Sequence, residues 1–246
     1  SYARAGAIYV ALNSILQATN TQFVENSSSE ASAIYFYLNK TPSELQTCIV
    51  RANASGKNGC ISLVETQLKV LNSVFEGNIE AAGSPGITSF NSTVAIVDSA
   101  FSNQTGLDGV HIYSNTDVLT ITGTNFTNSQ ASSAGGAIFA QFSSLNIQSS
   151  YFESLKAASG AALYLESSMS SIAASTFLNN SVTESGCDVY SLYSSLDVAD
   201  STFDSSNRES IMAQKLTSLK VSSSVFKRGS NVSRIYAADV NDLGVS

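Results

Sequence analysis

Two neighbouring stretches of the sequence decide the fold. Residues 135–152 read GGAIFAQFSSLNIQSSYF, and residues 160–177, which begin 25 positions later, read GAALYLESSMSSIAASTF. Both stretches place an aliphatic residue near the start, further apolar residues in the middle and Phe at the end. A repeat of this length is typical of chains built from similar units that stack on one another.

The same spacing runs along the whole chain in two columns. Successive members of the Phe column are 25 or 26 residues apart except for a last interval of 23, provided that Ile49 fills one gap. The Phe column contains Phe23, Phe75, Phe101, Phe126, Phe152, Phe177, Phe203 and Phe226. The Ile column contains Ile8, Ile34, Ile61, Ile87, Ile112, Ile138, Leu163, Val189, Ile211 and Ile235. Two columns in constant register indicate two core stacks.

A third apolar element precedes each Phe and alternates with polar residues, as in Leu68/Val70 and Leu145/Ile147, although Ser170/Ile172 weakens the pattern. Alternation with a period of two is typical of a strand that buries one face. The pattern therefore predicts that each repeat contains three short strands, Ser/Thr corners and a variable loop. If each coil adds one layer of about 4.8 Å, like residues lie over like.

We predict an all-β fold, a parallel β-helix or β-solenoid, as a single domain over residues 1–246. It has about ten coils of about 25–26 residues. The coils start near residues 6, 32, 59, 85, 110, 136, 161, 187, 209 and 233. A β-sandwich has no reason to repeat the same residue types in register, and the Leu/Asn framework of leucine-rich repeats is missing.

Composition supports strands and excludes several function classes. About a quarter of the residues are Ser or Thr, 43% are hydrophobic and 13% are charged, which disfavours both a disordered tail and a helical bundle. A net charge of −7 without a basic run argues against nucleic acid as a partner. No apolar run is long enough to insert this segment into a membrane.

The repeat resembles a known class of proteins. Gly135-Gly136-Ala137-Ile138, together with Phe75-Glu76-Gly77-Asn78 and Phe177-Leu178-Asn179-Asn180, resembles the Gly-Gly-Ala-Ile and Phe-x-x-Asn repeats of polymorphic outer-membrane proteins. More broadly, it resembles the right-handed β-helices of the pectin-lyase-like superfamily. This resemblance implies a right-handed coil, but the class contains adhesins, surface proteins and polysaccharide-cleaving enzymes alike. Phe101-Ser102-Asn103-Gln104 departs from the motif.

Signals of catalysis and metal binding are weak. Asp108-Gly109-Val110-His111-Ile112 resembles a strand of glycoside-cleaving β-helices, but hydrolysis needs a second carboxylate opposite the first. Asp117 lies in the same coil, and Asp98 lies in the preceding one. The acidic residues of coil 8 are spread around the coil, whereas calcium needs converging oxygens. We therefore predict no catalytic residue, no metal site and no cofactor. The acidic residues are Glu184, Asp188, Asp197, Asp200 and Asp204.

Cysteines and asparagines give further candidate sites. Cys48 and Cys60 could form a disulfide between two coils, which would leave Cys187 unpaired. Asn26, Asn78 and Asn180 follow the Phe column by three residues, where stacked amides could hydrogen-bond between layers. Glycosylation is predicted at eight sequons, so attached glycans are expected on a secreted chain. The sequons begin at Asn26, Asn39, Asn53, Asn91, Asn103, Asn125, Asn179 and Asn231.

These features predict an extracellular or cell-surface protein with a structural or adhesive role. The chain starts at Ser1 without an initiator Met, so we interpret it as a processed product or a segment. No amphipathic capping helix is expected at either end, so either the solenoid continues or copies stack head to tail into a homopolymer filament. A carbohydrate-binding or polysaccharide-cleaving protein is the alternative, with outward Tyr and Asp side chains lining a groove.

Overall fold

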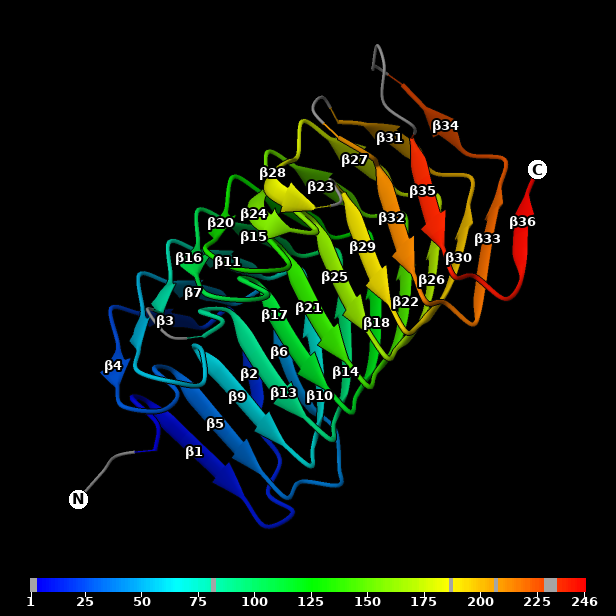
Figure 1. Cartoon of the computed structure of the whole chain (residues 1–246). Coiled ribbons are helices and arrows are strands. Elements are labelled where there is room, and N and C mark those ends of the chain that lie inside the picture. The colour runs from blue at the N-terminus through cyan, green and yellow to red at the C-terminus, as the bar shows by residue number, and fades with distance from the viewer. Residues whose placement is uncertain (1–3, 81–82, 186–187, 206–207, 228–233) are drawn as a thin grey trace.

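The chain forms one stack of parallel coils (Figure 1). The computed structural model describes residues 4–80, 83–185, 188–205, 208–227 and 234–246. All regular elements in these ranges are strands. Residues one coil apart pair in parallel, and the two chain ends lie at opposite ends of the stack. The predicted all-β parallel solenoid is thereby confirmed.

Strands that follow one another in the chain belong to different sheets. The first face of the solenoid, called the first sheet below, is formed by two consecutive sheets. One consists of β1 (Ile8–Ala11), β5 (Ile34–Tyr37) and β9 (Ile61–Val64), and the other of β13 (Ile87–Phe90), β17 (Ile112–Asn115), β21 (Ile138–Gln141), β25 (Leu163–Glu166), β29 (Val189–Leu192), β32 (Ile211–Gln214) and β35 (Ile235–Ala238). Backbone hydrogen bonds from Ile61 N to Gly86 O and from Glu65 N to Phe90 O connect the two. The second sheet consists of β2 (Gln17–Thr19), β6 (Ser43–Gln46), β10 (Gln67–Leu71), β14 (Thr93–Val97), β18 (Val118–Thr122), β22 (Ser144–Gln148), β26 (Met169–Ala173), β30 (Ser195–Ala199), β33 (Ser218–Ser222) and β36 (Leu243–Val245).

The third sheet carries the Phe column. It consists of β3 (Gln22–Val24), β7 (Ile49–Arg51), β11 (Val74–Glu76), β15 (Ala100–Ser102), β19 (Asn125–Thr127), β23 (Tyr151–Glu153), β27 (Thr176–Leu178), β31 (Thr202–Asp204) and β34 (Val225–Phe226). A fourth sheet, which we did not predict, lies where a variable loop was expected. It consists of β4 (Ser27–Ser28), β8 (Ala54–Ser55), β12 (Ile79–Glu80), β16 (Thr105–Gly106), β20 (Gln130–Ala131), β24 (Lys156–Ser159) and β28 (Ser181–Ser185).

The core contains like side chains in direct register. Phe75 pairs with Phe101, and Phe101 pairs with Phe126. Neighbouring rings from Phe75 to Phe226 have centroids 4.4 to 5.2 Å apart and are nearly parallel. From Phe75 to Phe203 the rings are fully buried, and burial of this much aromatic surface is a dominant stabilising contribution.

One member of the predicted Phe column was wrong. Val50, and not Ile49, lies between Phe23 and Phe75 and is fully buried. Ile49 pairs instead with Gln22 and Val74 and is only half-buried. The interval from Phe23 to the next inward residue is thus one longer than we inferred, because apolar character alone did not distinguish two neighbouring positions.

Many corners between sheets contain a residue in the left-handed backbone region. Thr47, Asn72, Ser149 and Ala174, for example, have φ between 48° and 55°. Non-glycine residues rarely adopt this conformation and pay about 1 kcal/mol or more for it, so surrounding contacts must hold it in place. In these four examples the next residue, Cys48, Ser73, Ser150 or Ser175, is buried and supplies such contacts.

The corner between the second and third sheets is closed by a ladder of hydroxyl groups. The backbone N–H of each ladder residue donates to the side-chain oxygen one coil above, as from Thr124 to Ser150 (3.3 Å) and from Ser150 to Ser175 (3.2 Å). Each hydroxyl donates in turn to the carbonyl two residues before it. The ladder residues are Cys48, Ser73, Ser99, Thr124, Ser150, Ser175, Ser201 and Ser224. Serines thus satisfy backbone groups that the sheets leave unpaired.

The other two polar corners use the same device with more varied side chains. Between the first and second sheets, the buried carboxylate of Asp117 takes one rung of a ladder whose other rungs include Ser92, Ser143 and Ser168. Between the third and fourth sheets, Asn53 accepts from Asn26 N and Nδ2, both at 3.0 Å, and its own N and Nδ2 donate to Asn78. The amide positions predicted from Asn26, Asn78 and Asn180 are therefore rungs of a ladder between layers.

Candidate functional site

The outer face of the first sheet carries an aromatic strip, formed by Tyr113, Phe139, Tyr164 and Tyr190. Adjacent rings lie 5.0 to 5.2 Å apart at interplanar angles of 1° to 11°. All four side chains are half-buried. Burial raises the pKa of Tyr164 to about 12, so its hydroxyl stays protonated. The ring faces cover one another, and the strip presents ring edges and hydroxyls to solvent.

A row of polar side chains runs beside the aromatic strip on the same strands. Asn115 Nδ2 donates to Gln141 Oε1 at 3.4 Å, and Gln141 Nε2 donates to Glu166 Oε2 at 3.1 Å. Tyr190 donates its hydroxyl proton to Gln214 Oε1 at 3.0 Å. These bonds between coils fix the side chains on a rigid backbone. The face is therefore a preorganised surface of aromatic edges, amides and one carboxylate.

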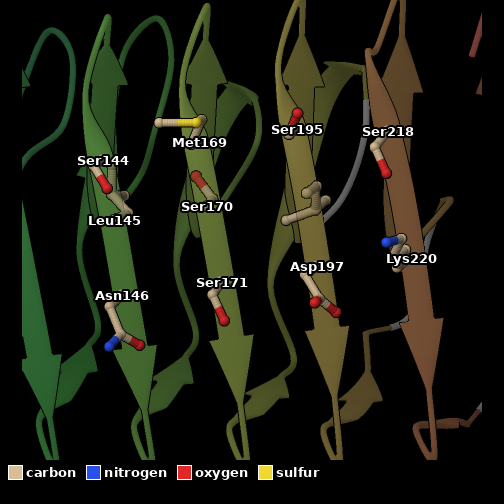
Figure 2. Close-up of a pocket in the computed structure, with 11 residues that line it drawn as sticks. Ser144, Leu145, Asn146, Met169, Ser170, Ser171, Ser195, Asp197, Ser218 and Lys220 are labelled. Carbon is tan, nitrogen blue, oxygen red and sulfur yellow. The ribbon is translucent and has the colours of Figure 1, made fainter. Parts of the chain in front are cut away.

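The outer face of the second sheet holds a shallow hollow of about 490 Å³ on strands β22, β26, β30 and β33 (Figure 2). Asn146, Ser171, Asp197 and Lys220 form a row across these strands, one residue in each coil. Figure 2 shows Met169 beside the serines that flank it. The hollow exists because most of these side chains are short, and its lining mixes polar groups with apolar surface, to which Leu145, Met169 and Leu196 contribute.

The structure gives Asp108 and His111 roles in the scaffold. His111 is fully buried, with ring centroids 5.6 Å from Phe101 and 5.5 Å from Phe126. Burial lowers the pKa of His111 to about 3, so the imidazole is neutral. Asp108 is half-buried, and its Oδ1 accepts from the backbone N–H of Ala134 at 2.9 Å. A fully buried imidazole cannot reach a polymeric substrate, so His111 is part of the core and does not face outward.

The acidic residues do not converge. Asp117 is buried in a corner ladder, where its carboxylate accepts from Ser92 N, Asn115 N and the Ser114 hydroxyl. Asp188 is buried inside the solenoid, whereas Asp197 and Asp200 are exposed. In the described ranges, no group of three or more His, Cys, Asp or Glu side chains is arranged to hold a metal ion.

Comparison with known proteins identifies the family. The family described as "right handed beta helix region" matches residues 59–226, which is more than half of the chain. The chain belongs to this family. No curated protein and no solved structure matches this β-helix. No helix in the part of the chain that the structure describes has the length and apolar character needed to cross a membrane.

The predicted disulfide of this β-helix is absent, because Cys48 and Cys60 are both free and buried. Cys48 occupies a rung of the hydroxyl ladder, where its N–H donates to Ser73 Oγ at 3.0 Å and its Sγ lies 3.3 Å from the Ala18 carbonyl. Burial raises the pKa of Cys60 to about 12, so this thiol is unreactive. Cys187 lies outside the described residues.

The structure separates the sequons into two groups. Asn39 and Asn53 are buried, and their Nδ2 atoms donate to the carbonyls of Val10 and Phe23. An oligosaccharide on that nitrogen cannot fit, so these two predicted sites are wrong for the folded protein. Asn26 is half-buried in the same ladder as Asn53. Exposed side chains remain at Asn91, Asn103, Asn125 and Asn179, and Asn231 lies outside the described residues.

Proposed function

We propose that this β-helix is an extracellular structural or adhesive rod, in which the interior sets a rigid shape and the outer faces bind partners. One observation carries this proposal. Of the side chains considered for glycoside cleavage, His111 and Asp117 are buried in the scaffold, and Asp108 accepts a hydrogen bond from a backbone N–H. What remains for recognition is the regular outer surface, above all the aromatic strip and its polar row.

The same observation favours a scaffold over an enzyme. Glycoside hydrolysis requires two accessible carboxyl groups that flank the scissile bond. Asp117, the carboxylate nearest to Asp108 in sequence among those considered, points into a corner and is buried. Reducing-end release from pectin-like polymers that is lost in Asp108→Asn would contradict the proposal.

Adhesion is tested most directly by substitution on two outer faces. Tyr164 lies in the aromatic strip, whereas Tyr151 is a half-buried Tyr on the outer face of the third sheet. We expect Tyr164→Ser to reduce adhesion to cell surfaces and the matched Tyr151→Ser variant to retain it. Equal adhesion of the two variants, each folded by circular dichroism, would show that the first sheet is not the adhesive face.

The proposed rod could also extend by self-association, as a head-to-tail homopolymer. Within the described residues, β2 and β36 each pair on only one side in the second sheet, so a second copy could add its edge strand there. Such contacts are heterologous and generate an open filament. Negative-stain images at increasing protein concentration should show rods that lengthen by stacking of coils. Uniform short rods at every concentration would rule out the filament and leave the adhesive role to be judged from the substitutions.

A further inference from the structure

The aromatic strip has a gap at its N-terminal end. The outward column to which it belongs begins with Tyr9 and Tyr35, which stack at 5.5 Å, and resumes at Tyr113. Ser62 and Thr88 occupy the two positions between them, and both are buried. Two rungs of the aromatic ladder are thus replaced by small hydroxyl side chains. Because coils are about 4.8 Å apart, each missing rung is as thick as one stacked ring.

A pocket of about 260 Å³ lies over Thr88 in this gap. Phe90 and Tyr113 supply its aromatic lining, and Lys57, Asn58 and Asp108 supply polar groups. Phe90 does not fill the missing rung, since it pairs with Asn115 and belongs to the neighbouring column. Its ring is tilted by 48° against Tyr113 at 5.9 Å, whereas rings within the strip are nearly parallel. The end of the ladder at Tyr113 is therefore incompletely covered.

The polar groups of the pocket are held by the scaffold. The bond from Ala134 N to Asp108 Oδ1 fixes the carboxylate from the coil above. Thr88 Oγ1 donates to the Ser84 carbonyl at 3.5 Å, which keeps the floor in place. The pocket is smaller than a typical site for a drug-sized ligand and offers one positive and one negative side chain. Its size and charges fit a single ring that is flanked by groups of opposite charge.

We propose that this pocket receives one aromatic side chain of a protein partner, which stacks on Tyr113 and completes the interrupted ladder. The partner segment carries a basic residue near that ring for Asp108 and an acidic residue for Lys57. Aromatic side chains are common anchors of protein interfaces, because they bury a large area at a small cost in conformational entropy. This inference rests on the adhesive function proposed above and assigns to it a recognition site.

The test fills the pocket with a larger side chain of the protein itself. Thr88→Tyr restores the residue type found in this column at Tyr35 and Tyr113, and it places a ring where the partner's ring would lie. Thr88→Val keeps the size of the native side chain and leaves the pocket open. The probe is the capped tripeptide Lys-Trp-Glu, titrated into the intact chain by NMR, with Lys-Ala-Glu as the control peptide.

We expect millimolar binding of Lys-Trp-Glu to the wild-type chain and to Thr88→Val, and binding weaker by about tenfold in Thr88→Tyr and with Lys-Ala-Glu. Asp108→Asn should weaken binding by about threefold and reduce its salt dependence. If Thr88→Tyr does not fold, the Asp108→Asn and Lys-Ala-Glu comparisons still decide the matter. Equal binding of the two peptides, or binding of methyl glucoside in place of the Trp peptide, would overturn the inference. If the wild-type chain adheres to cells but does not bind the Trp peptide, the pocket inference alone is overturned. If the wild-type chain does not adhere to cells, the proposed function is overturned.

Discussion

Two corners of this β-helix meet the same backbone requirement in different ways. The corner between the second and third sheets uses a nearly uniform ladder of hydroxyls from Ser73 to Ser224, with Cys48 as its one thiol. The corner between the third and fourth sheets uses Asn53, Asn78, Asn180, Ser129, Gln104 and Leu155 in equivalent places. We infer that an inward side-chain oxygen satisfies the free N–H one layer below wherever the side chain supplies one, and that Gln104 and Leu155 are rungs where the side chain does not.

The largest expected effect concerns the Asn-based corner. If the chain is made in a eukaryotic secretory pathway, a glycan on Asn39 or Asn53 should block folding, because both amide nitrogens are interior donors. The double variant Thr41→Ala, Ser55→Ala removes both sequons and should restore secretion of folded protein. Thr127→Ala, which removes the exposed Asn125 sequon, is the matched control and should restore nothing. Folded wild-type protein with a glycan on Asn53 by mass spectrometry would contradict the ladder.

The second prediction concerns the pH dependence of stability at the Asn-based corner. Asp188 accepts from Asn180 Nδ2 (2.8 Å), so a carboxyl group contacts the Asn-based ladder, and burial raises its pKa to about 7. The folded chain therefore holds a proton that the unfolded chain releases, and stability should fall as pH rises from about 4 to about 7. Asp204 faces the same group and adds to the shift, while Arg234 opposes it.

Chemical denaturation of the wild type and Asp188→Asn across this range measures the effect. As pH rises, the free energy of unfolding of the variant should increase by about 2 to 4 kcal/mol relative to that of the wild type. Comparison with the variant removes the contribution of Glu80, which has the same sign, and that of His111, which has the opposite sign. Parallel stability curves would show that Asp188 is ionised in the folded protein.

The hydroxyl ladder can be broken one rung at a time. Ser150→Ala removes the oxygen that accepts from the buried Thr124 N–H, and we expect a loss of about 2 kcal/mol in the free energy of unfolding. Ser150→Thr should keep most of the stability, because Thr124 itself occupies a rung of the same ladder. Thermal unfolding compares the three proteins. A Ser150→Ala variant as stable as the wild type would mean that the rung contributes nothing.

The smallest expected effect repairs an irregular rung. Gln104 is fully buried, and neither amide atom of its side chain has a hydrogen-bond partner among the described residues. Gln104→Ser introduces the side chain that Ser129 has in the next coil and should stabilise the fold by about 1 kcal/mol. Gln104→Leu, which introduces the side chain that Leu155 has in the same corner, separates removal of the amide from the gain of a hydroxyl. Destabilisation by both variants would show that the amide is satisfied.

The sequence predicts the apolar interior better than the corners. Phe75, Phe101 and Phe126 were recognisable because large apolar residues at constant spacing have one simple explanation, a common stack. The corner serines recur as regularly, at Ser73, Ser99, Ser150 and Ser175, but a Ser-rich chain hides that signal. A search for hydroxyl residues directly after Asn, Asp or Gly at the repeat spacing would have found part of it.

Other features required coordinates for physical reasons. The fourth sheet escaped prediction because strands such as Ser27–Ser28 and Ala54–Ser55 are two residues long and contain no alternation. The sequons at Asn39 and Asn53 have the same motif as those at Asn91 and Asn125, and only their burial separates them. The pocket over Thr88 also depends on register, because the missing ring is defined by its neighbours one coil away.

Amide hydrogen exchange at the corners, resolved by NMR, tests the central claim most directly. The account predicts that the N–H groups of Ser99, Thr124 and Ser150, each bonded to an oxygen in the next coil, exchange as slowly as strand amides such as that of Phe126. Exchange of these corner amides at the rate of an open turn, while Phe126 stays protected, would contradict it.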